Sequence, residues 1–296
     1  MVTVLLRGGL GNQMFQYAAG LAVARKKKVP LVLDTTFLND RFPRKQFTYR
    51  TYDLHVFDLA PRFTALSKIS TALPVPGVWL GIDLALVKIK EVLGMQRLIP
   101  EGGKKNFDRE VARADGEVAL WGFWQSEEYF KEIKDEVAQA FRFREPLRGE
   151  AVRIGEKIRR TASVSLHVRR KDYLLPKYQK VYGATDLSYY ERAARYIGER
   201  VSNPTFFVFS DDVAWCREYI RPPFPTIYLD DATAGPKASY HLQLMASCEH
   251  NIITNSSFSW WGAWLNGNAK KIVIAPQGWD AARRDYDRVP GAWIRL

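Results

Sequence analysis

Short apolar runs alternate regularly with longer amphipathic stretches through the second half of the chain. The runs are rich in Val, Ile, Phe and Leu, which is typical of buried strands, and the stretches between them repeat apolar residues at helical spacing. Strands that alternate with helices indicate a parallel sheet covered on both faces. We expect strands at 164–168, 205–209, 226–229, 251–254 and 271–274. We expect helices at 150–160, 187–200, 213–220, 238–248 and 259–265.

The first half of the chain opens with a similar pattern. An apolar run at 2–6 leads into the glycine-rich turn 7–13, after which apolar residues recur at helical spacing over 14–24. A second apolar run, 31–34, ends in an acid. A glycine turn between a strand and a helix lets the backbone approach a ligand, and the helix N-terminus favours an anion. The first half therefore contains a candidate ligand-binding turn of its own.

The remainder of the first half is less regular. We expect loops and short helices over 35–63, helices over 66–98 interrupted at 74–81, a strand at 118–121 and a helix reaching 141. Trp124, just after that strand, either stacks on a sugar or packs at a domain edge. An apolar set on the 66–98 segment is predicted to face the core, with a membrane or acceptor surface as the alternative: Leu84, Val87, Ile89, Val92 and Leu93.

The segment 144–149, which contains Pro146 and Gly149, is predicted to link two domains. A chain of 296 residues is long enough for two domains of ordinary size. We therefore expect an α/β protein with domains at 1–149 and 150–296. Cys216 and Cys248 both fall in predicted helices, so buried thiols are favoured over a disulfide.

The net charge of +12 favours an anionic partner. No nucleic-acid-binding motif accompanies the basic residues, so nucleic acid is a minority interpretation, while weak attraction to an anionic membrane surface is compatible with the charge. The start of the chain lacks the long apolar segment of a signal peptide, which predicts a cytoplasmic protein, with peripheral contact at the inner membrane face as an option. No clustered His or Cys spacing indicates a metal site.

Polar residues follow four of the five predicted strands of the second half, namely 164–168, 205–209, 226–229 and 251–254. In a parallel sheet these strand ends lie at one edge, which is where open α/β sheets bind ligands. Arginine grips phosphate through two parallel hydrogen bonds, and serines at a helix N-terminus offer backbone donors to an anion. Any one acid or serine here is more often a helix cap, but several on one edge favour a nucleotide-diphosphate pocket. The candidates are His167, Arg169, Asp172, Asp211, Asp230, Asn255, Ser256 and Ser257.

A dinucleotide site in the first half is the second hypothesis. Gly9 and Gly11 with Asp34 about 20 residues further on resemble the fingerprint of NAD-binding folds. Met14 stands where that fingerprint needs a third small residue, so the glycine pair alone is weak evidence. A basic nucleotide- or RNA-binding protein without catalysis is the third hypothesis.

Four motifs occur together in this chain: GGLGNQMFQYA at 8–18, HVRRKDY at 167–173, SDD at 210–212 and NSSFSWWGAWL at 255–265. In this order they resemble the bacterial α1,2-fucosyltransferases of glycosyltransferase family 11. The resemblance covers nearly the whole chain. It implies a GT-B arrangement, in which two Rossmann-like domains face each other across a cleft that holds GDP-fucose. Lys171 stands where the family often has glycine, and its role is open.

The resemblance also implies roles for individual residues. It suggests that Arg169 holds the β-phosphate, His167 and Asp230 the guanine end, and Asn255, Ser256 and Ser257 the diphosphate, while Asn12 faces the fucose. We include Gly11, Gln13, Asp211 and Phe258 among the residues expected to bind the donor. The implied reaction is metal-independent, needs no cofactor and inverts the anomeric centre, moving L-fucose to the 2-hydroxyl of a galactose-terminated oligosaccharide. Asp172 is the candidate base by position.

Overall fold

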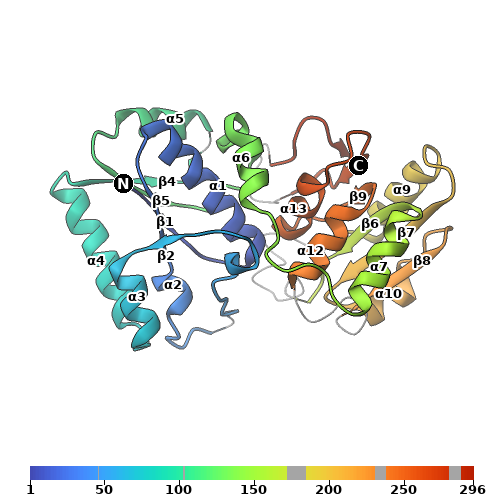
Figure 1. Cartoon of the computed structure of the whole chain (residues 1–296), viewed down its shortest axis with the longest axis horizontal. Helices are drawn as coiled ribbons and strands as arrows, with labels where there is room; N and C mark the ends of the chain where they lie inside the picture. Colours follow the sequence, from blue (N-terminus) through green and yellow to red (C-terminus); the bar gives the residue numbers. More distant parts are fainter. Residues whose placement is uncertain (46, 103, 172–184, 231–237, 280–287) are drawn as a thin grey trace. The chain divides into compact units, whose positions relative to one another are not determined.

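The computed structural model describes residues 1–45, 47–102, 104–171, 185–230, 238–279 and 288–296. The chain forms two compact units, Met1–Arg144 and Glu145–Leu296 (Figure 1). The division falls at the start of the segment 144–149. Each unit is an α/β domain built on its own parallel sheet.

The first unit contains a five-stranded sheet in which all neighbouring strands are parallel. Its order is β3-β2-β1-β5-β4, so β1 is central and chain order reverses between β1 and β5. β3 and β4 were not expected from the sequence pattern. The strands are β1 (Val2–Leu5), β2 (Leu31–Asp34), β3 (Arg62–Phe63), β4 (Gln96–Pro100) and β5 (Glu117–Trp121).

Helix α1 (Leu10–Lys27) is the buried helix of this unit. It begins four residues before the expected position 14, because the glycine turn closes at Gly9. A Cβ on Gly20 would lie 2.3 Å from Cγ2 of Val4, so only glycine allows α1 to pack this closely on β1. The other helices are α2 (Thr36–Asn39), α3 (Ala65–Ala72), α4 (Val78–Val92), α5 (Lys104–Arg113) and α6 (Lys134–Ala140). Three 3-10 turns lie at Leu54–Val56, Glu127–Tyr129 and Lys131–Ile133.

The second unit contains a six-stranded parallel sheet in the order β11-β10-β9-β6-β7-β8. Chain order runs outward from β6 through β7 and β8, then resumes on the other side with β9, β10 and β11. This reversal is the topological switch of a Rossmann-like sheet. The strands are β6 (Ala162–Val168), β7 (Pro204–Ser210), β8 (Thr226–Leu229), β9 (His250–Ile252), β10 (Val273–Ala275) and β11 (Ile294–Arg295).

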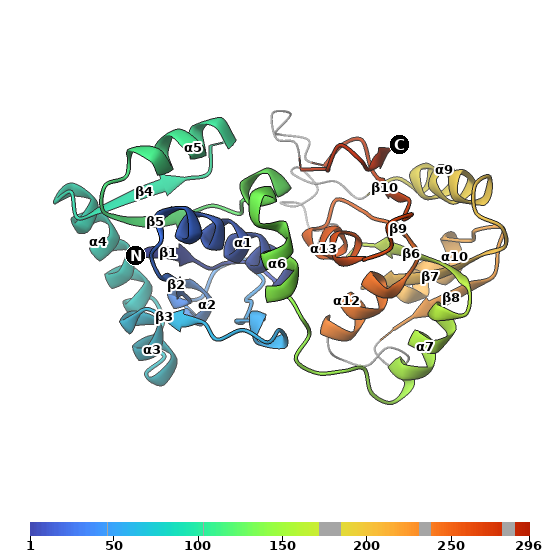
Figure 2. The ribbon, with the colours of Figure 1, turned by 45° about the horizontal axis from the view of Figure 1, so that its top comes forward.

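Helices cover both faces of this sheet, as the alternation of the sequence predicted (Figure 2). On one face, Val164, Leu166 and Val168 of β6 pack with residues of α9 (Leu187–Gly198) and α10 (Val213–Tyr219). On the other face, alternate residues of β7 pack with α7 (Glu150–Arg159) and α12 (Ala238–Ser247), and α13 (Ser257–Leu265) packs on α12. Odd-numbered residues of β6 therefore point toward the α12–α13 side.

Two side-chain predictions, for the cysteines and for Trp124, can be compared with the structure. Cys216 and Cys248 are buried free thiols, as expected. Trp124 is completely buried against Phe107 and Tyr129, so it packs inside the domain and does not stack on a sugar. None of the helices in the described part of the chain combines the length and the hydropathy that spanning a bilayer requires.

The expectation that the apolar residues of α4 face the core was wrong for most of them. Leu84, Ile89, Val92 and Leu93 are all exposed, whereas Asp83 on the same helix is buried. Helical periodicity locates an apolar stripe but does not say whether the stripe faces the core or the solvent.

Asp83 is directed inward to Asp34 at the end of β2, and the two carboxyl groups share a hydrogen bond. Asp34 also accepts hydrogen bonds from the backbone N–H of Thr36 and the hydroxyl of Thr64, both at 2.8 Å. Burial, and then the charge of Asp34, raise the pKa of Asp83 to about 7. Because Asp34 is buried and already occupied within the fold, its geometry does not support the ribose contact of the NAD hypothesis.

The buried pair predicts a pH-dependent stability that Asp83→Asn should remove. The pKa of Asp83 is higher in the folded chain than the ~3.9 of an unperturbed aspartate, so wild-type stability falls as pH rises from about 4 through about 7. Urea unfolding at pH 5 and pH 8 should show a larger loss for wild type than for Asp83→Asn. The exposed carboxyl variant Asp58→Asn serves as the control. Equal losses in wild type and Asp83→Asn would contradict the assignment.

Candidate functional site

The carboxyl edge of the second sheet brings together most of the predicted site residues. β6 and β9 are neighbours, with Leu166 opposite Ile252, and the chain order reverses between them. Ligands of open α/β sheets bind outside the strand ends at such a reversal. The residues that follow β6 and β9 directly therefore lie where a ligand is expected.

His167 is the last inward-facing residue of β6 on the α12–α13 side. It is buried, and its ring centroid lies 6.0 Å from that of Phe258 on α13. Burial, and then the positive charge of Arg169, lower the pKa of His167 to about 3, so the imidazole is neutral near pH 7. Its Nδ1 is buried without a hydrogen-bond partner among the described residues. A neutral imidazole with a buried nitrogen can hydrogen-bond an uncharged polar group such as a nucleobase.

Arg169 follows the end of β6 and is held by the next strand. A guanidinium nitrogen, Nη1, lies 3.2 Å from Oδ2 of Asp211, which follows β7. Oδ1 of the same carboxylate accepts a hydrogen bond from the backbone N–H of Arg170 at 2.9 Å. Asp211 therefore holds both the side chain of Arg169 and the backbone that follows it, while about a quarter of the Arg169 side chain is exposed. The sequence analysis included Asp211 among the residues expected to bind the sugar-nucleotide donor. In the structure its carboxylate contacts Arg169 and the N–H of Arg170, so Asp211 supports Arg169.

Arg170 points to the opposite face of the sheet, as the alternation of side chains along an extended chain requires. Its guanidinium lies 4.0 Å from the ring centroid of Trp215 on α10, and its Nε lies 3.3 Å from Asp212. Asp212 also accepts a hydrogen bond from the backbone N–H of Trp215 and so caps α10. Arg170 thus ties the end of β6 to α10, and Arg169 is left as the cation on the α13 side.

The start of α13 supplies backbone donors on the same edge. Ser256 is the N-cap residue, but its side chain makes no capping hydrogen bond. The first-turn N–H groups of a helix lack partners within the helix and carry the positive end of its dipole, which favours an anion. Asn255 is buried, and its side-chain oxygen accepts hydrogen bonds from Thr254 at 3.0 Å and Thr185 at 3.4 Å.

The threonine pair behind Asn255 was not found by sequence reasoning. Thr185 and Thr254 hydroxyls lie 2.5 Å apart, and together they fix the turn between β9 and α13. Thr254 directly precedes the NSSFSWW motif and could have been suspected from that position. Thr185 lies about seventy positions away, and no local pattern marks it.

Two further sequence candidates belong to the second unit, Asp230 and Asp172. Asp230 follows β8, two strands from β6 in the sheet order, so it lies ~10 Å along the edge. Asp172 falls outside the described residues. Among the residues that are described, no group of three or more His, Cys, Asp or Glu side chains could hold a metal ion.

The glycine turn of the first unit has its own hydrogen-bond network. Gln13 is fully buried: its Nε2 donates to the carbonyls of Gly8 and Thr51, and its Oε1 accepts from the N–H of Asp53. The Asn12 side-chain oxygen accepts from Gln125 at 2.7 Å. Gln13 therefore braces the turn against the 51–53 segment. Its side-chain nitrogen and oxygen are both engaged within the fold and are not directed to a sugar-nucleotide donor. Gly11, also buried, forms the first turn of α1.

Comparisons with known proteins agree with these features. The profile described as "Glycosyl transferase family 11" matches residues 116–295. The alpha-1,2-colitosyltransferase of Escherichia coli is 33% identical over all of this chain and 99% of its own length. The O-antigen biosynthesis glycosyltransferase WbnK of Escherichia coli is 31% identical over 98% of this chain and 99% of its own. Among solved structures, fucosyltransferase NodZ from Bradyrhizobium is 15% identical with a TM-score of 0.49, covering 88% of this chain and 90% of that one.

The two α/β units and the cationic sheet edge thus belong to a glycosyltransferase. The chain is a member of glycosyl transferase family 11, as its motifs indicated.

The neighbouring acids Asp211 and Asp212 offer a matched test of how the site is organised. Asp211→Ala removes the support of Arg169, and misplacement of a catalytic group by ~1 Å can cost ~10²-fold in rate. We expect Asp211→Ala to lower the turnover number at saturating donor by ~10-fold or more. Asp212→Ala removes the cap of α10, so it should cost stability of ~1 kcal/mol and affect turnover less. Turnover assays and thermal unfolding of both variants check this order, and the reverse order would contradict it.

Proposed function

We propose that the protein transfers L-fucose from GDP-β-L-fucose to the 2-hydroxyl of a terminal β-galactoside, giving an α1,2-linked product. The observation that carries the proposal is the pairing of two anion-binding groups, Arg169 and the first turn of α13, at the β6–β9 switch point. A cation and a helix N-terminus that follow adjacent strands suit a diphosphate. The neutral His167 beside them suits the uncharged edge of a base.

The names of relatives support the linkage and the acceptor class. Galactoside alpha-(1,2)-fucosyltransferase 2 of Hylobates lar is 27% identical over 90% of this chain and 69% of its own length. The Escherichia coli colitosyltransferase is likewise named for an alpha-1,2 linkage. Both names favour transfer to a 2-hydroxyl.

The positions of the site residues support a particular orientation of the donor. In this proposal Arg169, Asn255 and the first turn of α13 bind the diphosphate, because they follow β6 and β9. His167 and Phe258 lie at the start of the base pocket, and Asp230 accepts hydrogen bonds from the guanine edge further along. The family resemblance makes Asn12, whose turn is shaped by Gly11 and Gln13, our candidate for a contact with the sugar.

The proposed mechanism depends on charge developing on the leaving group. Cleavage of the bond between fucose and phosphate leaves negative charge on GDP and positive charge on the sugar ring. Arg169 and the α13 N-terminus are held in place before the reaction, so they stabilise the diphosphate without reorganising. Attack from the opposite face of the ring inverts the β-linked donor to an α-linked product. Asp172 is our candidate for the base that takes the acceptor proton.

A colitosyl donor is the second candidate, because a full-length relative carries that name. The two donors would use the same nucleotide-binding edge and differ only in the sugar. The preference for fucose or colitose therefore depends on the residues around the sugar.

A donor and linkage assay tests the proposed function directly. With lactose as acceptor, GDP-fucose should give a product whose NMR spectrum shows fucose joined α to the 2-hydroxyl of galactose. GDP-colitose, supplied in parallel, should react more slowly. Faster turnover of GDP-colitose would select the second candidate, and a β-linked product or another hydroxyl would contradict the proposal.

Arg169 should contribute mainly to the rate. A guanidinium can form two parallel hydrogen bonds to phosphate, whereas lysine is a point charge. Removal of one preorganised donor typically costs ~10²–10³ in rate. We expect Arg169→Ala to lose that much turnover while remaining folded, and Arg169→Lys to recover little. Arg170→Ala should lose less, because Arg170 binds Trp215 and Asp212 on the other face.

The measurements are turnover and GDP affinity, with circular dichroism as the folding control. A loss of turnover that exceeds the loss of GDP affinity indicates a contact that strengthens in the transition state. Near wild-type turnover in Arg169→Ala would be incompatible with the proposed mechanism.

The proposed reaction needs no metal ion, because protein cations stabilise the leaving group. Turnover should therefore be unchanged in excess EDTA. Adding Mg²⁺ or Mn²⁺ to the chelated enzyme is the control. Loss of activity on chelation that either ion restores would show that a metal takes part.

A further inference from the structure

The outward side of helix α4 is apolar along its whole length. Val78, Ile82, Leu86, Ile89 and Leu93 follow one another at intervals of three or four residues, and 39–65% of each is exposed. This spacing places them in one stripe on the helix. Helices of soluble domains usually turn such a stripe inward.

The inward side of α4 contains the polar residue instead. Asp83 is buried and hydrogen-bonded to Asp34, which fixes the rotation of the helix with its apolar stripe outward. The carboxyl pair and the exposed stripe are therefore two consequences of one orientation. Rotating the helix to bury the stripe would break the contact with Asp34.

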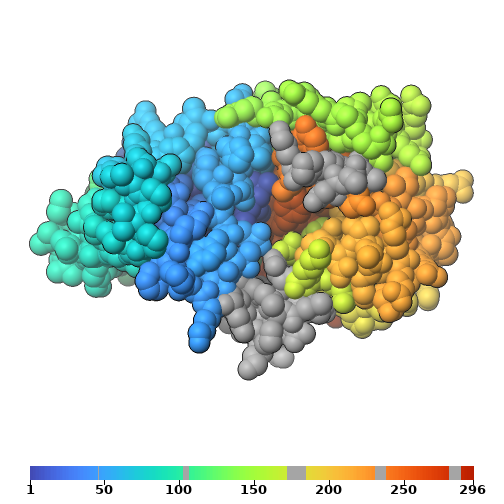
Figure 3. Space-filling view, turned by 90° about the horizontal axis from the view of Figure 1, so that it is seen from below, coloured from blue at the N-terminus to red at the C-terminus, as the bar shows by residue number. Residues whose placement is uncertain are grey.

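The apolar surface continues beyond α4 to the end of α3. Leu73 and Val75 in the connection between the helices are 60% and 48% exposed, and Phe42, at 53%, lies against Gly77. Trp79 donates a hydrogen bond to the carbonyl of Leu73, which holds the connection on α4. We call the whole area the α3–α4 surface: Phe42, Ile69, Leu73, Val75, Val78, Ile82, Leu86, Ile89, Val92 and Leu93. Helices α3 and α4 form the cyan and teal part of the surface in Figure 3.

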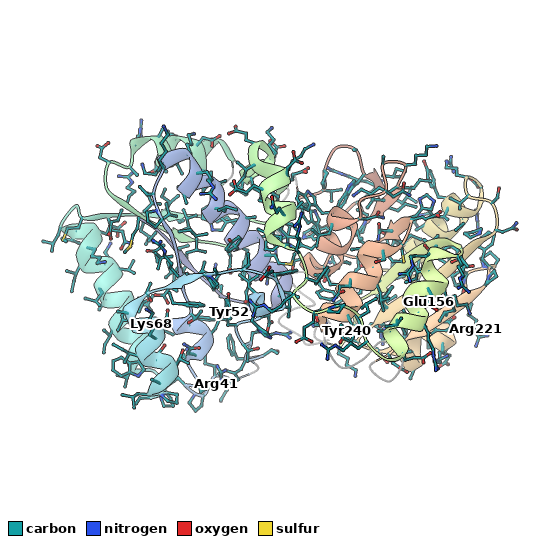
Figure 4. The ribbon with its side chains drawn as sticks, in the orientation of Figure 1. Arg41, Tyr52, Lys68, Glu156, Arg221 and Tyr240 are labelled. Atoms are coloured by element: carbon teal, nitrogen blue, oxygen red, sulfur yellow. The ribbon has the colours of Figure 1, made fainter. Side chains whose placement is uncertain are left out.

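The charges around this surface are mostly basic. Between residues 62 and 93 the sequence contains Arg62, Lys68, Lys88 and Lys90, and its two acids are the buried Asp83 and the half-buried Glu91. Lys68 on α3 is exposed and is labelled in Figure 4. Glu91 on the same helix pairs with Lys88, and Glu117 of β5 pairs with Lys90. The surface is thus apolar with a basic rim.

We propose that the α3–α4 surface binds an anionic lipid bilayer, with α4 lying in the plane of the interface. Apolar side chains on one face of a helix enter the boundary between headgroups and acyl chains, and basic residues near them are attracted to anionic lipid. A contiguous apolar area of this kind is uncommon on a soluble monomer and indicates an interaction site. The net charge of +12 acts in the same direction.

A second copy of the chain fits the same surface less well. A two-fold interface would place the same patch on both partners, so Lys68 and its basic neighbours would approach their own copies. The one partly exposed acid of the stretch 62–93, Glu91, is already paired with Lys88 and does little to compensate this repulsion. A lipid headgroup layer supplies the missing negative charge.

Vesicle flotation tests the proposal on the full chain. The wild-type protein should float with vesicles of phosphatidylglycerol and phosphatidylcholine, less with phosphatidylcholine alone, and less at high salt. The double variant Ile82→Asp with Ile89→Asp should lower the bound fraction at least ten-fold. Val152→Asp is the matched control, because Val152 is also exposed but lies on α7 of the second unit. Thermal unfolding and turnover with a soluble acceptor, which should be unchanged, confirm that each variant is folded.

The alternative outcomes overturn the proposal. If wild type fails to bind anionic vesicles, or if the double variant binds as wild type does, the α3–α4 surface is not a lipid site. If wild type dimerises without lipid and the double variant is monomeric, the surface is an interface between copies.

Discussion

The ion pair between Arg169 and Asp211 is the interaction on which the proposed site depends. It joins the ends of β6 and β7, and through the N–H of Arg170 it also fixes the backbone that leaves β6. Because the next residue is tied to α10 by Trp215, the two adjacent arginines separate to opposite faces of the sheet. The cation that remains on the α13 side is thereby oriented before any ligand arrives.

The two units use similar architecture for different purposes. In each unit chain order reverses beside the first strand, and a turn leads from that region into a buried helix. Neither α1 nor α13 has a side-chain cap at its N-terminus, but α13 begins beside the strand end that carries Arg169. The turn before α1 is braced internally by Gln13, and the acid at the end of β2 is buried with Asp83. These differences favour nucleotide binding by the second unit.

Sequence patterns predicted the second sheet more fully than the first. The bounds of β8 were predicted correctly, because an apolar run lies between Pro225 and Asp230. The two-residue strand β11 was missed, since only its long-range pairing with β10 makes it a strand. The opposite directions of Arg169 and Arg170 continue the alternation of side chains along β6. The support of Arg169 by Asp211 and of Asn255 by Thr185 could not be predicted, because both depend on strand register and on contacts distant in the chain.

Hydrogen–deuterium exchange of the full chain with and without GDP tests most directly whether the nucleotide binds at the edge of the second sheet. The account predicts that GDP slows exchange in peptides covering the end of β6 around Arg169 and the first turn of α13 after Ser256. Peptides covering the glycine turn around Gly11 should change little, since GDP without its sugar leaves the first unit's proposed contact unused. Protection confined to the glycine turn, with none at Arg169 or Ser256, would contradict the account.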